Sequence, residues 1–160
     1  MGTDIISFMM NGPVDTDKTN AAHPAVRGVG VIFFIKQTNQ FMFYLRDNKD
    51  SIPDPNMVSL LGGHMEAGEG AEETVIRELD EELDNLGTSR PFRPSPLTHF
   101  RTYIDGRGTE QNIFGCILET VPNLRPNEGQ RLIFLNRDEV PSTIFAFGFS
   151  QVIQDFAQSV

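Results

Sequence analysis

Apolar residues in this chain fall into short runs separated by turn-forming residues, a pattern typical of a sheet protein with few helices. Residues 27–36 (RGVGVIFFIK) are almost continuously apolar and rich in β-branched and aromatic side chains, which predicts a buried central strand. Thr38-Asn39 turns the chain, and residues 40–46 (QFMFYLR) return as its antiparallel partner. Further strands are predicted over residues 57–61, 97–104, 112–120 and 131–135.

Two segments have helical periodicity instead. After the glycines at 62–63, apolar residues gather on one arc of a helix that we expect to run to about Leu86. Residues 150–159 have Val152, Ile153 and Phe156 on one side and predict a closing helix. A single helical turn is expected over residues 138–140. Strands on both sides of a central helix, with a second helix at the end, predict an α/β fold in which a mixed sheet has a helix on each face.

Length and composition narrow the class of protein. The 160 residues suit one domain over 1–160, in which residues 1–25 are mostly loop with an edge strand over 5–10. The net charge of −9 argues against binding to DNA or RNA polymers, because no basic face meets the phosphate backbone. Cys116 is the only cysteine, which excludes an intrachain disulfide. No apolar run has the length of a membrane span, so we expect no membrane partner and a cytoplasmic location.

The predicted central helix is strongly acidic. Nine carboxylates fall between Glu66 and Asp84, with Arg77 as the only basic residue among them. Within this segment the glutamates at 78, 81 and 82 share one helix face, where like charges repel. The face is either solvated or neutralised by a cation such as Mg²⁺, which prefers carboxylate oxygens.

The spacing of residues in this segment favours neutralisation by a cation over a solvated face. Residues 63–83 (GHMEAGEGAEETVIRELDEEL) match the pattern Gx5Ex7REUxEE, in which U is aliphatic, and on this motif the chain resembles the Nudix hydrolase family. The match departs at Asp84 and Asn85, where the family has a glycine and an aliphatic residue. The resemblance implies the Nudix α/β/α sandwich and hydrolysis of a nucleoside diphosphate linked to another group X, with Mg²⁺ or Mn²⁺ as cofactor.

The resemblance also implies roles for single residues. By position in the motif, Glu78 and Glu82 are the main metal ligands, and Glu81 is a further ligand or accepts a proton from water. In the family a carbonyl of the glycine turn often joins the metal, a role that would fall to Gly62.

The resemblance also implies roles for two more glutamates. Glu69 is expected to pair with Arg77 and so to orient the metal-binding side chains. Glu128 lies in Asn-Glu-Gly-Gln, just before a predicted strand, as a similar glutamate does in MutT-like enzymes. It is either a further metal ligand, the general base, or a solvated loop residue, and the sequence leaves Glu81 and Glu128 both open as the base.

The sequence signals for substrate-binding residues are weaker than those for the metal ligands. Arg46 ends a strand where related enzymes often bind phosphate or ribose, although a surface arginine is equally compatible. Phe147 could stack on a nucleobase or belong to the core. Tyr103 lies where a diadenosine-polyphosphate branch has a tyrosine, but it also suits strand packing. The proline typical of the ADP-ribose branch is absent near Arg101.

We therefore expect a MutT-like pyrophosphohydrolase that acts on a small phosphorylated nucleotide. A nucleoside triphosphate is the favoured substrate, giving a monophosphate and pyrophosphate. A nucleotide sugar and a dinucleoside polyphosphate are the alternatives, and a non-catalytic nucleotide-sensing module is a third. The family resemblance allows a homodimer, but no residue pattern requires one.

Overall fold

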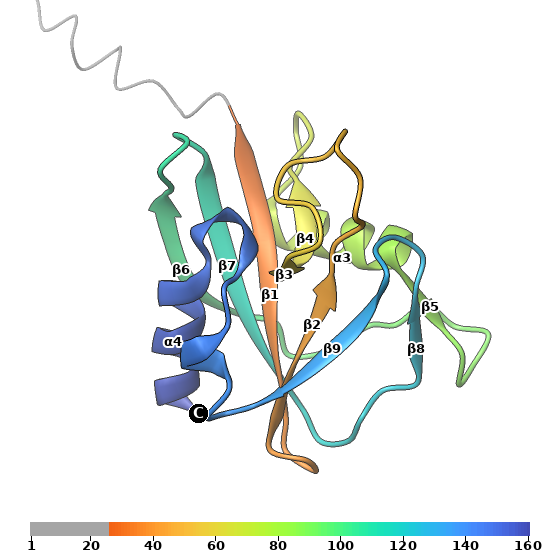
Figure 1. Cartoon of the computed structure of the whole chain (residues 1–160). Coiled ribbons are helices and arrows are strands. Elements are labelled where there is room, and N and C mark those ends of the chain that lie inside the picture. The colour runs from red at the N-terminus through yellow and green to blue at the C-terminus, as the bar shows by residue number, and fades with distance from the viewer. Residues whose placement is uncertain (1–25) are drawn as a thin grey trace, which may run out of the picture.

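Strand β1 (Arg27–Ile35) is the centre of the sheet in the computed structural model, which describes residues 26–160 (Figure 1). It pairs antiparallel with β2 (Gln40–Leu45) and β4 (Leu61–His64), each along a different part of its length. On its other side it pairs in parallel with β7 (Glu110–Leu118) over its whole length. The predicted edge strand over residues 5–10 lies outside the described residues.

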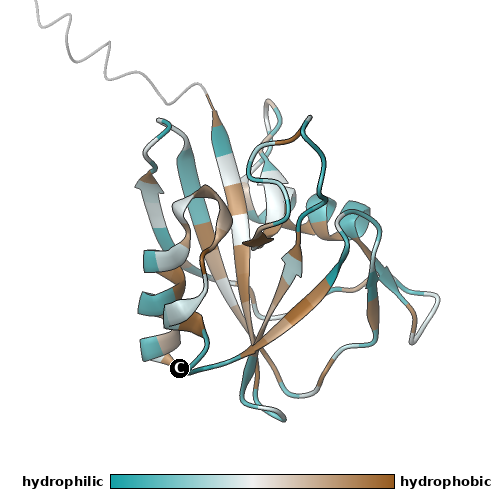
Figure 2. Cartoon of the chain, viewed as in Figure 1, coloured by the Kyte–Doolittle hydropathy of each residue, from teal (hydrophilic) through white to brown (hydrophobic). Residues whose placement is uncertain are grey.

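Alternate residues of β1 face opposite sides of the sheet. Val31 and Phe33 belong to a core cluster that includes Val75 of helix α3 (Ala71–Glu82). Ile32 belongs to a second cluster, packed against helix α4 (Ser150–Ser159). Figure 2 shows apolar residues along the strands and on the side of α4 that faces them. The predicted mixed sheet between two helices is confirmed, because a strand buried on both faces needs a cover on each.

The remaining elements extend this arrangement. β3 and β9 pair with β2, β6 pairs with β7, and β5 and β8 form a separate two-stranded sheet. Two 3₁₀ turns precede α4, and the first begins at Val140, so the helical turn expected over 138–140 lies slightly later. The bounds of these strands and 3₁₀ turns are Val58–Ser59 (β3), Leu83–Asn85 (β5), Thr98–Ile104 (β6), Leu124–Pro126 (β8), Arg131–Asn136 (β9), Val140–Ser142 (η1) and Ala146–Gly148 (η2).

The predicted end of the central helix was wrong. Helix α3 ends at Glu82 and not near Leu86, because Leu83 adopts an extended conformation and starts β5. β5 pairs with β8, which lies between the strands predicted over residues 112–120 and 131–135. Backbone hydrogen bonds to this distant strand replace another helical turn, and they make Glu82 the last helical residue.

None of the helices in the described residues has the length and apolar content that crossing a bilayer requires.

Candidate active site

The glycine turn and α3 are in direct contact. A Cβ atom on Gly63 would lie 2.3–2.5 Å from the carboxyl atoms of Glu78, so only glycine leaves room for that carboxylate. The N–H of Gly62 donates a hydrogen bond of 3.0 Å to Oε2 of Glu82. The turn at the end of β4 therefore positions two of the three predicted helix carboxylates.

Glu82 is the most unusual carboxylate of the site. Its side chain is only 4 % exposed, and it accepts a hydrogen bond from the Gly62 N–H. Burial raises its pKa to about 9, and the charges of Glu78, Glu128 and Glu81 add to the effect. Burial, together with Glu81 and Glu128, also raises the pKa of Glu78, against the lowering influence of Arg77. Arg77 compensates part of the charge on Glu78, whereas Glu82 has no ion-pair partner among the described residues.

Arg77 links the loop before α3 to the carboxylates on the helix. Its Nε donates to Glu69 at 2.9 Å, the ion pair that the motif implies. Its other nitrogens donate to Glu78 at 3.0 Å, Glu81 at 3.3 Å and the His64 carbonyl at 2.9 Å. One guanidinium therefore ties β4, the loop and the helix together, which limits the orientations open to Glu78.

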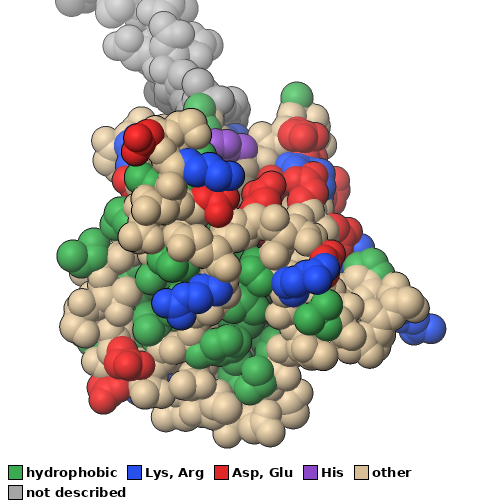
Figure 3. Space-filling model, turned by 45° about the vertical axis from the view of Figure 1, so that its right-hand side comes forward, with side chains coloured by type: hydrophobic (Ala, Val, Ile, Leu, Met, Phe, Trp, Pro, Cys, Tyr) green, Lys and Arg blue, Asp and Glu red, His purple; other side chains and the backbone are tan. Residues whose placement is uncertain are grey.

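Glu128 is held beside the helix end by its neighbours. The N–H of Asn127 donates to the Glu82 carbonyl at 2.7 Å, and the N–H of Gln130 donates to the Leu45 carbonyl at 2.8 Å. The exposed Glu128 side chain lies between these two attachments, close enough for its charge to raise the pKa of Glu82. Acidic side chains gather on the upper part of the molecule in Figure 3, with arginine or lysine among them.

These carboxylates fit a hard divalent cation. A buried group whose pKa is raised by three neighbouring carboxylates gains most from a positive charge, and oxygen ligands are those that Mg²⁺ and Mn²⁺ take. Across residues 26–160, no three His, Cys, Asp or Glu side chains already stand together in a ligand arrangement. Binding would therefore require side-chain rotations, most readily by Glu81, whose side chain is 54 % exposed, and by the exposed Glu128.

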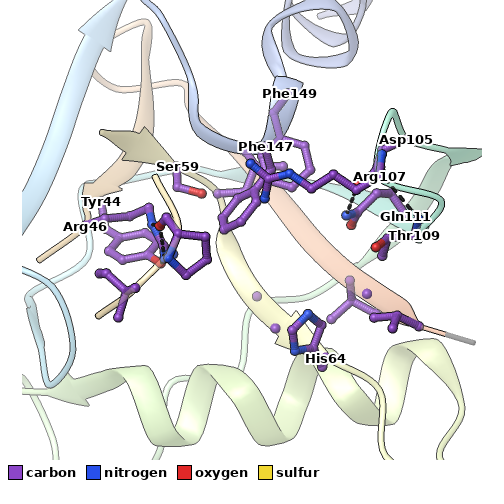
Figure 4. A pocket seen from close by; sticks show the side chains of 18 residues that line it. Tyr44, Arg46, Ser59, His64, Asp105, Arg107, Thr109, Gln111, Phe147 and Phe149 are labelled. Atoms are coloured by element: carbon purple, nitrogen blue, oxygen red, sulfur yellow. Dashed lines mark hydrogen bonds between the residues drawn. The ribbon is translucent and has the colours of Figure 1, made fainter. Parts of the chain in front are cut away.

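A cavity of about 490 Å³ opens on the other side of the glycine turn (Figure 4). Gly62, Gly63 and His64 form the part of its wall next to α3. The rest comes from segments distant in sequence, namely Tyr44, Arg46, Ile52, Pro53, Asp105, Arg107, Thr109, Gln111, Phe147 and Phe149, with parts of β1 and β3. The volume is in the range of small-molecule sites.

Two of the predicted substrate residues line this cavity. Arg46 uses its guanidinium to donate to the carbonyls of Pro53 and Asp54 and to the Tyr44 hydroxyl. The Arg46 guanidinium carbon also lies 4.7 Å from the ring centroid of Phe147. Arg46 thus fastens the loop that follows β2 and supports an aromatic wall, and most of its donors are already engaged.

Tyr103 has a different environment. It does not line the cavity but packs, half-buried, against the core cluster under α4. Its buried hydroxyl has no hydrogen-bond partner among the described residues. The structure therefore separates Tyr103 from Arg46 and Phe147, whereas the sequence grouped the three.

Several residues in the cavity wall or directly behind it had no signal in the sequence. Asp54 accepts hydrogen bonds from the Phe147 N–H at 2.8 Å and from Arg107 at 3.0 Å, and so joins three separate segments. Gln111 and Asp105 lie at the opposite wall. In the sequence, Asp105 and Arg107 fall between the strands predicted over residues 97–104 and 112–120. No spacing rule connects residue 54 with 107 or 147, and only the folded chain brings them together.

Comparison with known proteins agrees with this geometry. A family model for the NUDIX domain matches residues 24–155. The chain belongs to the Nudix family of hydrolases. The resemblance based on residues 63–83 is thus confirmed for the family, and the match also takes in the cavity segments outside the motif. No curated protein sequence matches the chain significantly.

Solved Nudix structures share the fold at low sequence identity. The NUDIX domain of Shewanella oneidensis NrtR, complexed with ADP ribose, has a TM-score of 0.68 and 17 % identity, and the match covers 96 % of this chain and 97 % of that one. A MutT from a study of the Aliivibrio salmonicida and Vibrio cholerae proteins has a TM-score of 0.65 and 16 % identity, and the match covers 84 % of this chain and 98 % of that one. The E. coli dihydroneopterin triphosphate pyrophosphohydrolase has a TM-score of 0.58 and 16 % identity, and the match covers 84 % of this chain and 96 % of that one.

Proposed function

We propose that this Nudix protein is a pyrophosphohydrolase that uses Mg²⁺ or Mn²⁺ to split a nucleoside triphosphate into a monophosphate and pyrophosphate. The observation that supports this most is the shared glycine turn. One side of Gly62-Gly63 contacts Glu82 and Glu78, and the other side lines the cavity. A nucleoside in the cavity would therefore have its phosphates beside the carboxylates.

In this proposal Glu78 and Glu82 hold the metal, and Arg77 with Glu69 keeps the helix carboxylates in place. A bound divalent ion would neutralise phosphate charge and make a coordinated water more acidic. Glu128 is the better candidate for the general base, since no donor among residues 26–160 hydrogen-bonds to it. Glu81 instead accepts a hydrogen bond from Arg77, which makes it a poorer proton acceptor.

The cavity supports a mononucleotide as substrate. Its volume of about 490 Å³ suits one base with its sugar, and its wall combines aromatic rings with a few polar groups. A dinucleoside polyphosphate would leave its second nucleoside outside this space. The NrtR domain bound to ADP ribose and the dihydroneopterin triphosphate enzyme are similar in fold, and their ligands support a phosphorylated small molecule.

The direct test is the variant Glu82→Gln. It keeps the acceptor for the Gly62 N–H but removes the charge that would hold the metal, so we expect Mg²⁺-dependent hydrolysis to fall at least about a hundredfold. Glu72→Gln, at an exposed position of the same helix, is the matched control and should retain activity. Full activity in Glu82→Gln, with unchanged Mg²⁺ dependence, would rule out the ligand assignment.

The substrate is tested separately with a panel of nucleoside triphosphates, nucleotide sugars and dinucleoside polyphosphates. Products are identified by chromatography in the presence of Mg²⁺. We expect the highest kcat/KM for a nucleoside triphosphate, with monophosphate and pyrophosphate as products. A higher value for a nucleotide sugar or a dinucleoside polyphosphate would replace the proposed substrate but keep the reaction class.

A further inference from the structure

One wall of the cavity carries a buried amide whose orientation is determined by its neighbours. Gln111 is only 7 % exposed, and it lines the cavity together with Asp105 and Thr109, across from Tyr44 and Arg46 (Figure 4). Its Nε2 donates a hydrogen bond of 3.0 Å to Oδ2 of Asp105. No described residue donates a hydrogen bond to the Oε1 of Gln111. This oxygen is open to the cavity, and an acceptor without a donor at a cavity wall favours a ligand that supplies one.

Asp105 determines which end of the amide faces the cavity. Its Oδ1 accepts hydrogen bonds from the backbone N–H groups of Arg107 at 2.9 Å and Thr109 at 3.0 Å, which hold the carboxylate in one orientation. Its other oxygen therefore points to Gln111. A carboxylate only accepts hydrogen bonds, so the amide must present nitrogen to Asp105 and keep Oε1 on the opposite side.

Gly28 leaves space beside this oxygen. A Cβ atom on Gly28 would lie 2.9 Å from Oε1 of Gln111 and 3.5 Å from the carbonyl oxygen of Gly63. Gly28 also lines the cavity. The bare Cα thus leaves the acceptor open, on a wall that continues to the glycine turn and the carboxylates behind it.

We propose that Gln111 is a specificity-determining residue that selects nucleobases with an exocyclic amine at the edge facing it. The amine would donate to Oε1, whereas a carbonyl at the same place would set two acceptors against each other. This inference rests on the proposed function, because it assumes that the cavity holds the base of the substrate. It deepens that function by naming amine-bearing bases as the preferred class.

The test uses pairs of substrates that differ by exchange of an amine for a carbonyl, namely CTP with UTP and ATP with ITP. For the unaltered protein we expect kcat/KM to favour the amine-bearing member by about tenfold or more, because the disfavoured partner leaves buried polar groups unpaired. Equal kcat/KM within both pairs would overturn the inference while leaving the proposed hydrolysis intact. Absence of hydrolysis for every nucleotide would overturn the proposed function and this inference together.

The sharper variant is Asp105→Asn. Because Oδ1 keeps both backbone N–H bonds, the new amide nitrogen must stand where Oδ2 stood and donate to Gln111. The Gln111 amide then turns, so that its nitrogen faces the cavity. We expect the preference to invert, with UTP and ITP becoming the better members of their pairs. A general loss of activity with an unchanged ratio would contradict the proposed role.

A second variant and a control separate recognition from folding. Gln111→Leu removes the acceptor, and we expect both ratios to fall to about one while the carbonyl-bearing substrates are still hydrolysed. Thr109→Val alters a neighbouring cavity residue but keeps the hydrogen bond between Gln111 and Asp105, so its ratios should match those of the unaltered protein. Ratios that collapse in Thr109→Val and persist in Gln111→Leu would overturn the assignment.

Discussion

At the residue scale, Glu82 is the side chain in which folding and function conflict. It ends α3, it is buried, and burial raises its pKa to about 9. Keeping it charged without a cation costs free energy, because three other carboxylates add to the penalty of desolvation. A divalent ion would remove that cost, so metal binding and folding stability should be coupled at this residue.

The conflict predicts how the stability of the metal-free protein depends on pH. The folded-state pKa of Glu82 lies above the ordinary value of 4.5. The stability that protonated Glu82 contributes to the folded protein is therefore complete below pH 4.5 and is lost as the pH rises towards 9. Glu82→Gln should therefore be more stable than the unaltered protein at pH 8 in EDTA, by on the order of 2 kcal/mol, and equally stable near pH 4.5. Urea unfolding at both pH values measures the difference.

Magnesium provides the complement to that experiment. Adding Mg²⁺ at pH 8 should stabilise the unaltered protein and the Glu72→Gln control, but not Glu82→Gln. If Glu82→Gln were the less stable protein at pH 8 in EDTA, Glu82 would not carry the cost that its burial implies.

The two candidate bases make a second prediction at this scale. Glu128 is held between Asn127 and Gln130 and is free of hydrogen-bond donors among the described residues, while Glu81 is bound to Arg77. With saturating Mg²⁺, Glu128→Gln should lower kcat by about 10²–10⁴-fold, as expected for loss of a general base. Glu81→Gln should lower it much less. A larger loss in Glu81→Gln, measured under the same conditions, would exchange the two roles.

At the scale of elements, the site depends on how closely β4 approaches α3. Gly63→Ala places a methyl group where the Glu78 carboxylate now lies. The carboxylate must move, so we expect the affinity for Mg²⁺ and kcat/KM each to fall about tenfold or more, with a stability loss of about 1–3 kcal/mol. Titration calorimetry and steady-state kinetics measure these changes.

Gly70→Ala is the matched control at the other end of the same loop. A Cβ there would meet its nearest atom at 3.6 Å, an ordinary contact, so the metal affinity should stay near that of the unaltered protein. Equal Mg²⁺ affinity in Gly63→Ala and the unaltered protein would show that the close approach does not position the carboxylate.

At the scale of the whole molecule, features that depend on local spacing could be predicted from the sequence. The apolar run of β1, the helical arc of α3 and the periodicity of α4 each reflect one chain segment in contact with a sheet or helix face. The motif over residues 63–83 combines a turn, an ion pair and a helix face in one stretch, so its spacing indicates a site. The fold followed from these patterns, and so did the ion pair between Glu69 and Arg77.

The features that could not be predicted from the sequence depend on pairings between distant segments. The early end of α3 results from β5 pairing with β8, about forty residues later, and helix propensity contains no sign of that partner. The cavity wall is similar, because Arg107 and Phe147 line it from distant segments and are joined through Asp54. Gln111 showed in the sequence only as a polar residue before an apolar strand. Its importance arises from Asp105 and from the missing side chain at Gly28.

Every role proposed for the site depends on a divalent ion that binds between the end of α3 and the glycine turn, beside the cavity. The most direct measurement is a crystal structure of the protein with Mn²⁺ and a non-hydrolysable nucleoside triphosphate, using anomalous scattering to locate the metal. We predict a Mn²⁺ peak about 2.1 Å from carboxylate oxygens of Glu78 and Glu82, with the phosphates beside it and the base in the cavity. A Mn²⁺ ion bound elsewhere, with these two carboxylates unliganded, would show that Glu78 and Glu82 are not metal ligands.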